Sequence, residues 1–152
     1  MRNKLKSSGA EHFTKLMRSV TNTPAWRSLS SHAKVLLLEL RFEWKGPKAN
    51  NNGCISLSTR QAADRLGVSL QTISKAFQDL QAKGFIVVTE IGHPGVHGYA
   101  RCHRYELTEI ALPHQREGRH LYRQWKVGHD FDVVKARAHN PTGFNGTSRI
   151  RT

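Results

Sequence analysis

The sequence of 152 residues is poor in acidic residues: 11 Asp and Glu stand against 24 Lys and Arg. The resulting formal net charge is +13 at pH 7, with histidine counted as neutral. A one-signed excess of this size favours a polyanionic partner, and nucleic acid is the commonest one. Solubilising surface charge alone explains such an imbalance less well.

Long apolar runs and cysteine are also scarce. No stretch approaches the roughly 20 apolar residues that a transmembrane helix needs. The N-terminal sequence MRNKLKSSGAEHF is basic but lacks the apolar centre of a signal peptide. Cys54 and Cys102 fall in expected strands and fit reduced, half-buried packing residues better than a disulfide framework. We therefore expect a cytoplasmic protein with no membrane partner.

Motifs of catalysis are missing from the sequence. It contains no G-x-x-x-x-G-K-[ST] phosphate loop, no nucleophile elbow and no paired catalytic carboxylates. Asp64, Asp79 and Glu90 are explained as the surface of helices or strands. We therefore expect that the protein is not an enzyme and uses no cofactor or small-molecule ligand.

The nearest approach to a metal site is a group of histidines and one cysteine, namely His93, His97, Cys102 and His103. Strong zinc signals are a C-x-x-C pair or an H-x-x-x-H pair on a helix, whereas H-P-G-V-H falls in a turn here. The sequence therefore predicts no metal site.

The most informative stretch runs from Ser58 to Phe85 and reads as two helices joined by a tight turn. Ser58 and Gln61 form the S-x-x-Q pattern of a capping box at a helix N-terminus. Gly67 falls where the chain must turn with positive φ, a geometry that glycine adopts without a Cβ penalty. Ser69 then caps a second helix.

This second helix has one apolar and one polar face. Its apolar residues follow the three-and-four spacing of a buried face, and they are Ile73, Ala76, Phe77 and Leu80. Gly84 ends the helix. The opposite face carries short or hydrogen-bonding side chains: Gln71, Thr72, Ser74, Lys75, Gln78 and Asp79.

The pattern resembles the helix-turn-helix of DNA-binding proteins, with small Ala63, then Gly67, then Ile73 at the positions that the motif keeps for small, turn and packing residues. In this family the second helix lies in the major groove with its N-terminal residues on base edges. The alternative of an ordinary helical hairpin is disfavoured, because turn, caps and apolar register agree together. The resemblance implies that the helix over residues 70–83 reads bases with Ser69, Gln71, Thr72, Ser74, Lys75 and Gln78.

Upstream of this stretch we expect a flexible basic arm over residues 1–9 and then a helix over residues 10–20. The apolar face of that helix is Phe13, Leu16, Met17 and Val20. Residues 21–28 are expected to connect it to the next helix, with Trp26 held in the core. Ser30 or Ser31 caps that next helix, which is apolar almost all round and therefore central. The remaining expected elements are a polar loop over 48–53, strands over 54–57, 85–91 and 99–107, and a turn over 92–98.

This order of elements resembles a winged helix over residues 10–108. The segments I-S-L-S, Q-A-A-D-R-L-G-V-S and K-G-F-I resemble bacterial regulators of the gluconate-repressor and multiple-antibiotic-resistance-regulator type. They also resemble winged-helix domains of plasmid replication initiators and mobile-element regulators. The expected fold is α+β: a winged helix-turn-helix with a three-helix core, a small antiparallel sheet with a β-hairpin wing, an extra terminal helix and basic tails. The sequence departs from these regulators after residue 108, where we expect neither an effector-binding domain nor a second winged helix.

In such a fold, basic side chains at the hairpin and in the first helix of the motif contact phosphates or the minor groove. A solvated hairpin without such contacts is the alternative. The resemblance assigns backbone or wing contacts to Arg60, His97, Arg101, His103 and Arg104, with Lys4 and Lys6 added from the arm.

The C-terminal part is read as an extension over residues 109–128 and a mobile basic tail over residues 129–152. The segment RHLYRQWKV predicts a short helix that packs Leu121, Tyr122 and Trp125 against the body. The DFDVV stretch adds one strand or helical turn, and the sequence does not decide between them.

Together these features predict a sequence-specific double-stranded DNA-binding protein. The reading we favour is a bacterial transcriptional regulator at the nucleoid, bound as a homodimer to a palindromic site. A replication initiator or a recombination accessory factor with the same fold is the alternative. A protein-interaction module is less favoured, because the reading helix exposes no large apolar residue apart from Leu70. RNA binding is weaker still, since the stacking aromatics of an RNA-binding sheet are missing.

Overall fold

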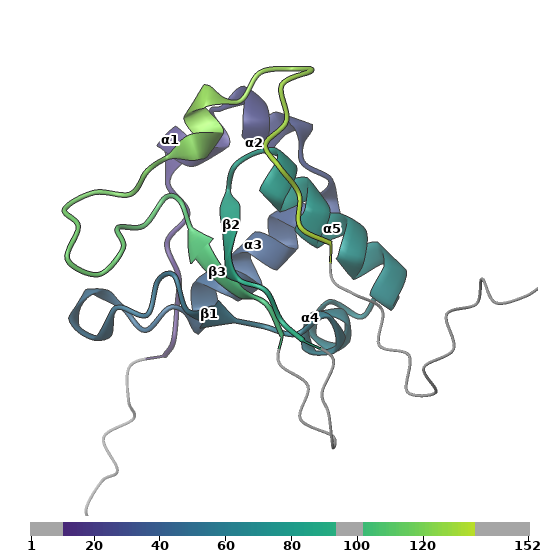
Figure 1. Ribbon diagram of the computed structural model, residues 1–152, viewed down its shortest axis with the longest axis horizontal. Helices are drawn as coiled ribbons and strands as arrows, with labels where there is room; N and C mark the ends of the chain where they lie inside the picture. The colour runs from purple at the N-terminus through teal and green to yellow at the C-terminus, as the bar shows by residue number, and fades with distance from the viewer. Residues whose placement is uncertain (1–10, 94–101, 136–152) are drawn as a thin grey trace, which may run out of the picture.

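The computed structural model describes residues 11–93 and 102–135. Within these ranges the protein is an α+β fold of five α-helices around a three-stranded antiparallel sheet (Figure 1). None of the helices described is long and apolar enough to cross a membrane. The expected arm over residues 1–9 and the part of the expected tail (129–152) that follows residue 135 lie outside the described residues, as do His97 and Arg101.

Helix α3 (Ser31–Glu43) is the centre of the core, as expected from its apolar composition. The Ser30 hydroxyl caps it by accepting a hydrogen bond from the Ala33 amide at 3.1 Å. Leu36, Leu37 and Leu40 are fully buried against α4 (Thr59–Leu66), α5 (Leu70–Ala82) and β1 (Ile55–Ser56). The helix is not buried on all sides, as its composition suggested, because Val35 on its outer face is 46% exposed.

The expected helix over residues 10–20 is wrong for most of its length. Only α1 (Arg18–Thr21) is helical, and no side chain caps it. Residues 11–17 instead run along α3, where the Thr14 hydroxyl accepts a hydrogen bond from Arg41 Nε at 3.0 Å. Most of the expected apolar face therefore lies at the surface: Phe13 is 71%, Leu16 42% and Met17 53% exposed.

The expected connection over residues 21–28 contains a helix, α2 (Pro24–Ser28). The Thr23 hydroxyl accepts a hydrogen bond from the Trp26 amide at 3.2 Å, and Pro24 occupies the first turn, where its missing N–H costs nothing. Trp26 packs against the core with its ring edge on Phe85, so its predicted place is confirmed.

The polar loop before β1 contains a 3-10 turn, η1 (Pro47–Ala49), and is held by asparagine side chains. Asn52 is 2% exposed, and its carboxamide pairs with the Leu107 backbone. Oδ1 accepts from the Leu107 amide at 2.7 Å, while Nδ2 donates to the carbonyls of Leu107 at 3.0 Å and Ile110 at 2.8 Å. The loop is thus fixed to the chain that follows the sheet.

The sheet consists of β1, β2 (Ile86–Glu90) and β3 (Arg104–Leu107) in the order β1-β3-β2. The antiparallel pairing was predicted and is confirmed, although each strand is shorter than expected. Ile86 pairs with Leu107 and Val88 with Tyr105, and a register shift follows between Val88 and Glu90. This irregularity lies where β2 leaves the core.

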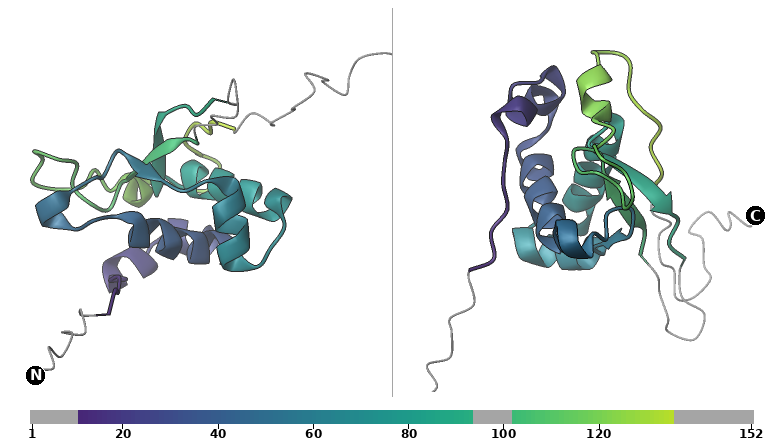
Figure 2. Two further views of the ribbon diagram at one scale, coloured as in Figure 1. Left: turned by 90° about the horizontal axis from the view of Figure 1, so that it is seen from below. Right: turned by 90° about the vertical axis from the view of Figure 1, so that its left-hand side faces the viewer.

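The C-terminal extension belongs to the same core. Tyr122, in the 3-10 helix η3 (Leu121–Gln124), and the following Trp125 are both buried, as predicted. The Tyr122 ring stacks on Phe85 with a centroid distance of 4.8 Å. Residues 131–135, called the C-terminal segment below, form neither the strand nor the helical turn expected. They run alongside α5 (Figure 1). They lie on the face opposite residues 11–17, called the N-terminal segment below (Figure 2).

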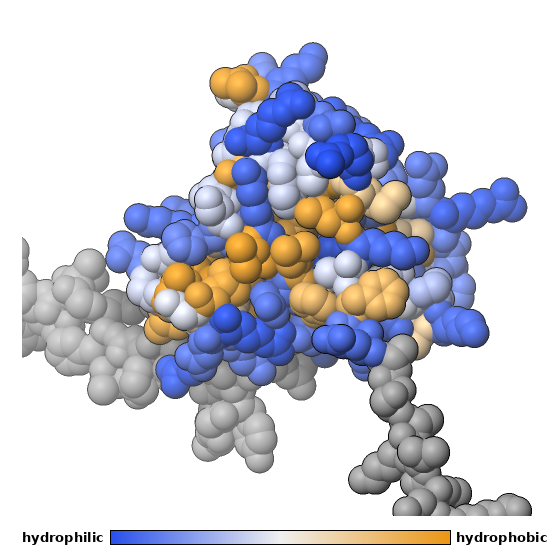
Figure 3. All heavy atoms as spheres, turned by 180° about the vertical axis from the view of Figure 1, so that it is seen from behind, coloured by the Kyte–Doolittle hydropathy of each residue, from blue (hydrophilic) through white to orange (hydrophobic). Residues whose placement is uncertain are grey.

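The face seen from behind, which carries the N-terminal segment and α3, has apolar side chains at its surface (Figure 3). The exposed large apolar residues of these two elements are Phe13, Leu16, Met17 and Val35. The polar face of α5 and the apolar face of the molecule are therefore separate surfaces.

Candidate nucleic-acid interface

The first helix of the pair, α4, begins with the capping box predicted from the sequence. Ser58 Oγ accepts a hydrogen bond from the Gln61 amide, and Gln61 Oε1 accepts one from the Ser58 amide, both at 3.1 Å. Two of the unpaired amides of the helix end are thereby satisfied. Ala62 and Ala63 are buried, and Leu66 packs at the edge of the core. The inner face of α4 is thus small and apolar, as expected.

A short turn joins α4 to α5 at the predicted glycine. Gly67 has φ +68 and ψ +37, the left-handed conformation that ends α4. Ser69 caps α5, because its hydroxyl accepts a hydrogen bond from the Thr72 amide at 3.1 Å. Local sequence therefore fixes the angle at which α5 leaves the turn.

An ion pair holds α4 against α3. Arg65 Nη1 lies 2.6 Å from a carboxylate oxygen of Glu43 and 3.4 Å from one of Glu39. The hydrogen bond from the guanidinium to Glu43 is the main reason that the pKa of Arg65 lies above its usual value. The charge of Arg65 is consequently neutralised within the protein and adds little to an electrostatic surface.

Helix α5 buries one face and exposes the other, as its sequence predicts. Ile73, Ala76, Phe77 and Leu80 are buried, and the Phe77 ring stacks on Tyr105 at 5.3 Å. On the outer face Gln71 and Lys75 are exposed, while Ser74 and Gln78 are half-buried. Leu70, the one large apolar side chain on the outer face, is 50% exposed.

Two of the six expected base-reading side chains have a structural task. Ser69 Oγ lies 2.9 Å from Thr72 Oγ1 and also accepts from the Thr72 amide. Either hydroxyl must give up this contact, or share it, to reach a base. Among the described contacts of α5, the side chains of Gln71, Ser74, Lys75 and Gln78 have no hydrogen bond or ion pair within the protein.

The expected backbone contacts are distributed over two elements. Arg60 is exposed in the first turn of α4. Arg104 is exposed on β3, with its Nε 3.4 Å from a Glu90 carboxylate oxygen. An exposed pair of this kind contributes less than about 1 kcal/mol, so a phosphate can replace Glu90 at low cost.

His103 lies elsewhere than its assignment to the wing surface requires. Its side chain is 6% exposed, and its Nδ1 atom accepts a hydrogen bond from the Gly92 amide at 2.7 Å. The Nε2 atom is buried beside a cavity of about 40 Å³ and has no hydrogen-bond partner within the described part. Burial lowers the pKa of His103, which favours the neutral ring. His103 is therefore packed inside the molecule just before β3 and does not lie on an exposed surface.

The four residues weighed for zinc are only partly described, because His97 lies outside the described ranges. Among the residues that are described, no group of three His, Cys, Asp or Glu side chains is placed to hold a metal ion. Cys54 is exposed, and the Cys102 sulfur lies 2.9 Å from the Ser56 hydroxyl. Both are free thiols, as expected, but Cys54 is exposed rather than half-buried, and neither cysteine lies in a strand.

Sequence reasoning missed one part of this surface, the C-terminal segment beside α5. Gln81 is 3% exposed, and its carboxamide makes two hydrogen bonds with Val134. Oε1 accepts from the Val134 amide at 2.8 Å, and Nε2 donates to its carbonyl at 3.1 Å. The Phe131 amide also donates to the Ala82 carbonyl at 2.9 Å. The only available signal was Gln81 itself, an amide next to the apolar face of α5.

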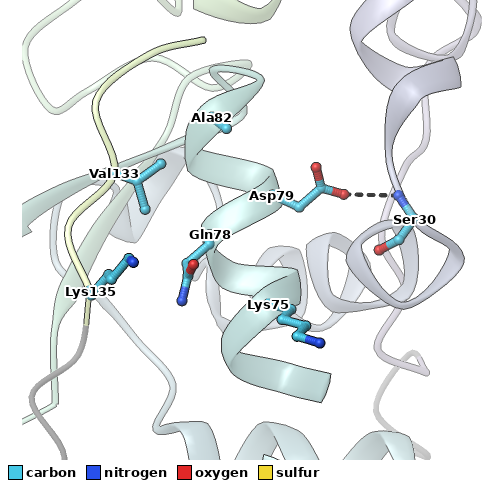
Figure 4. A pocket seen from close by; sticks show the side chains of 7 residues that line it. All are labelled: Ser30, Lys75, Gln78, Asp79, Ala82, Val133 and Lys135. Atoms are coloured by element: carbon cyan, nitrogen blue, oxygen red, sulfur yellow. Dashed lines mark hydrogen bonds between the residues drawn. The ribbon is translucent and has the colours of Figure 1, made fainter. Parts of the chain in front are cut away.

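The C-terminal segment and α5 form the walls of an open groove of about 510 Å³. Lys75 and Gln78 line it from α5, Val133 and Lys135 from the C-terminal segment, and Ala82 lies near its upper end (Figure 4). Further lining residues are Ser30 and Asp79.

No protein-family model, no curated protein and no solved structure matches the chain. The resemblance to winged-helix regulators therefore stays a prediction from the sequence. The geometry of the described residues carries the functional argument below.

Proposed function

We propose that the protein binds double-stranded DNA in a sequence-specific manner and acts as a bacterial transcriptional regulator of the winged helix-turn-helix type at the nucleoid. The proposal rests on one observation. The outer face of α5 carries Gln71, Lys75 and Gln78 in one stripe, and these polar side chains have no partner among the described residues.

The chemistry of this stripe suits the major groove. A glutamine carboxamide can donate to and accept from adenine at the same time, and a lysine ammonium can donate to the O6 and N7 atoms of guanine. Spacing of three and four residues places Gln71, Lys75 and Gln78 on one side of the helix. A duplex that meets the outer face of α5 therefore meets three hydrogen-bonding groups in a row.

Charge supplies the second requirement, which is affinity for the phosphate backbone. The formal net charge is +13, and Arg60 and Arg104 lie exposed on α4 and β3. Each phosphate contact releases condensed counterions, so binding of this kind weakens with salt. The side chains on α5 would supply specificity, and the arginines would position the duplex.

The experiment is selection of bound duplexes from a random pool at about 150 mM salt, near physiological ionic strength. We expect one motif, recovered as an inverted repeat with half-sites about one helical turn apart if two copies bind. Tight binding at low salt with no recovered motif would contradict the regulator and favour a DNA-architectural role.

Two substitutions then separate reading from anchoring. Gln71→Ala should relax the sequence preference, whereas Arg104→Ala should weaken operator and random DNA alike and reduce the salt slope by about one unit. Gln124→Ala on η3 and Arg116→Ala in the loop before η3 remove exposed side chains of the same types away from α5. Identical behaviour of both variants on operator and random DNA would refute these roles.

A further inference from the structure

We infer that the C-terminal segment is a third DNA-contacting element, in which Lys135 neutralises a backbone phosphate beside the groove read by α5. Gln81 acts as the positioning residue that holds Lys135 there. This inference rests on the proposed DNA-binding function and adds to it a contact that the family resemblance does not include.

The C-terminal segment is fixed to α5 in a single register. The Gln81 carboxamide uses its donor and its acceptor on the Val134 backbone, and the Phe131 amide caps the Ala82 carbonyl at the end of the helix. The Phe131 ring covers Gly84, where a Cβ atom would lie only 2.6 Å from the ring. The contacts of Phe131 and Val134 fix residues 131–134 against α5, so the position of Lys135 along the helix is fixed as well.

Lys135 lies on the same side of α5 as the proposed reading stripe. In Figure 4 its side chain extends from the C-terminal segment toward Gln78, while Lys75 stands one turn further toward the N-terminus. Both lysines line the groove, and neither has an ion-pair partner among the described residues.

The one carboxylate that lines the groove is already compensated. Asp79 Oδ2 accepts a hydrogen bond from the Ser30 amide at 2.9 Å, and Oδ1 lies 2.6 Å from Lys83 Nζ. The two lysines therefore leave the groove with a net positive charge, which favours an anion over a neutral or cationic ligand. Ala82 and Val133 add apolar side chains to its lining, and the groove is open, so it does not enclose a small anionic ligand with polar groups.

Helix geometry places this charge at the height of the phosphates. Gln78 lies seven residues beyond Gln71, which corresponds to about 10 Å along the helix axis at 1.5 Å per residue. The major groove is about 8.5 Å deep. If the stripe from Gln71 to Gln78 reads base edges, it already spans about the depth of the groove, so Lys135, on the C-terminal segment beside Gln78, lies at the rim, where the backbone runs.

The test uses the full chain, with operator and random duplexes from the selection experiment, over a series of salt concentrations. Lys135→Ala should lower the slope of log K against log[salt] by about 0.9 units, which is roughly a fivefold loss of affinity near 150 mM salt, and should do so on both duplexes. Lys135→Arg should restore the slope. The matched control is Lys126→Ala, which removes the same charge from the turn after η3, away from the groove.

Gln81→Leu tests the positioning. Gln81 is buried and cannot reach DNA itself, yet its loss should lower the salt slope as Lys135→Ala does, while the recovered motif stays the same. In the double variant the two effects should not add. Val134→Pro removes the amide that Gln81 Oε1 accepts from and leaves Gln81 itself unchanged, so it should repeat the result if Gln81→Leu does not fold.

The outcomes separate this inference from the proposed function. An unchanged slope in Lys135→Ala, while Gln71→Ala still relaxes the motif, overturns the phosphate contact and leaves the DNA-reading role intact. Additive losses in the double variant overturn the positioning role of Gln81. Absence of duplex binding by the unmodified protein overturns both proposals.

Discussion

Replacement of Asn52 by alanine is expected to be one of the most destabilising single changes in the protein. The Asn52 side chain is buried and substitutes for a neighbouring strand at the end of β3, where it accepts from the Leu107 amide and donates to the carbonyls of Leu107 and Ile110. Alanine offers none of these groups. Water cannot replace them easily, because the Leu107 side chain is fully buried beside them.

The expected loss is about 3 kcal/mol of unfolding free energy. A buried donor left without a partner costs about 1–3 kcal/mol, and each further hydrogen bond lost costs about 1 kcal/mol. Since a domain of this size is stable by about 5–15 kcal/mol, the loss is a large fraction of the total. The melting temperature should fall by about 6–12 °C.

Thermal and urea unfolding, followed by circular dichroism, measure this effect. The control is Asn22→Ala, which removes the same side chain from an exposed position after α1. The N52D variant keeps the acceptor for the Leu107 amide but loses the donor, and it should regain stability as pH falls, because the protonated acid can donate again. If Asn52→Ala unfolds within about 0.5 kcal/mol of the Asn22→Ala control, the Asn52 side chain does not hold the loop to the sheet.

Two further predictions concern the turn glycines and the buried histidine. Gly67→Ala should cost about 1–2 kcal/mol from left-handed backbone strain alone, since nothing lies within 4 Å of the added Cβ. Gly84→Ala should cost clearly more in the same urea titration, because its Cβ also meets Phe131 at 2.6 Å; equal costs would show that Phe131 moves freely. Because the folded pKa of His103 is lowered, its neutral form stabilises the fold above about pH 6.5, and stability is lost as pH falls below that value. Urea titrations between pH 8 and 5 should show a weaker pH dependence in His103→Asn, and an unchanged dependence would contradict the burial argument.

The elements that sequence reasoning predicted correctly depend on contacts within about four residues. The Ser58 and Gln61 capping box, the left-handed Gly67 and the Ser69 cap each join backbone groups to side chains of the same turn. Such contacts depend little on the rest of the chain, so their sequence pattern is sufficient. A cap residue, Thr23, followed by Pro24 also marks the start of α2. We did not predict this helix because it has only five residues.

Apolar spacing proved a weaker guide at the N-terminus. The spacing of Phe13, Leu16 and Met17 fits a helix, yet a helix needs a surface on which to bury that face. Residues 11–17 meet α3 instead through Thr14 and through the His12 ring edge on Phe42. Periodicity describes which side chains would share a face, and it does not show that a partner for that face exists.

The parts that escaped prediction depend on pairs far apart in sequence. Asn52 bonds to Leu107, and Gln81 bonds to Val134, across more than fifty residues in each case. A single sequence offers no signal that these amides share a backbone partner. For the proposed interface this separates two kinds of residue. Gln71 lies on a helix whose start and exposed face are set by local sequence, so the groups proposed to read bases could be predicted from the sequence. The phosphate contact proposed for Lys135 depends on the long-range hydrogen bond at Gln81, so it could be inferred only from the three-dimensional structure.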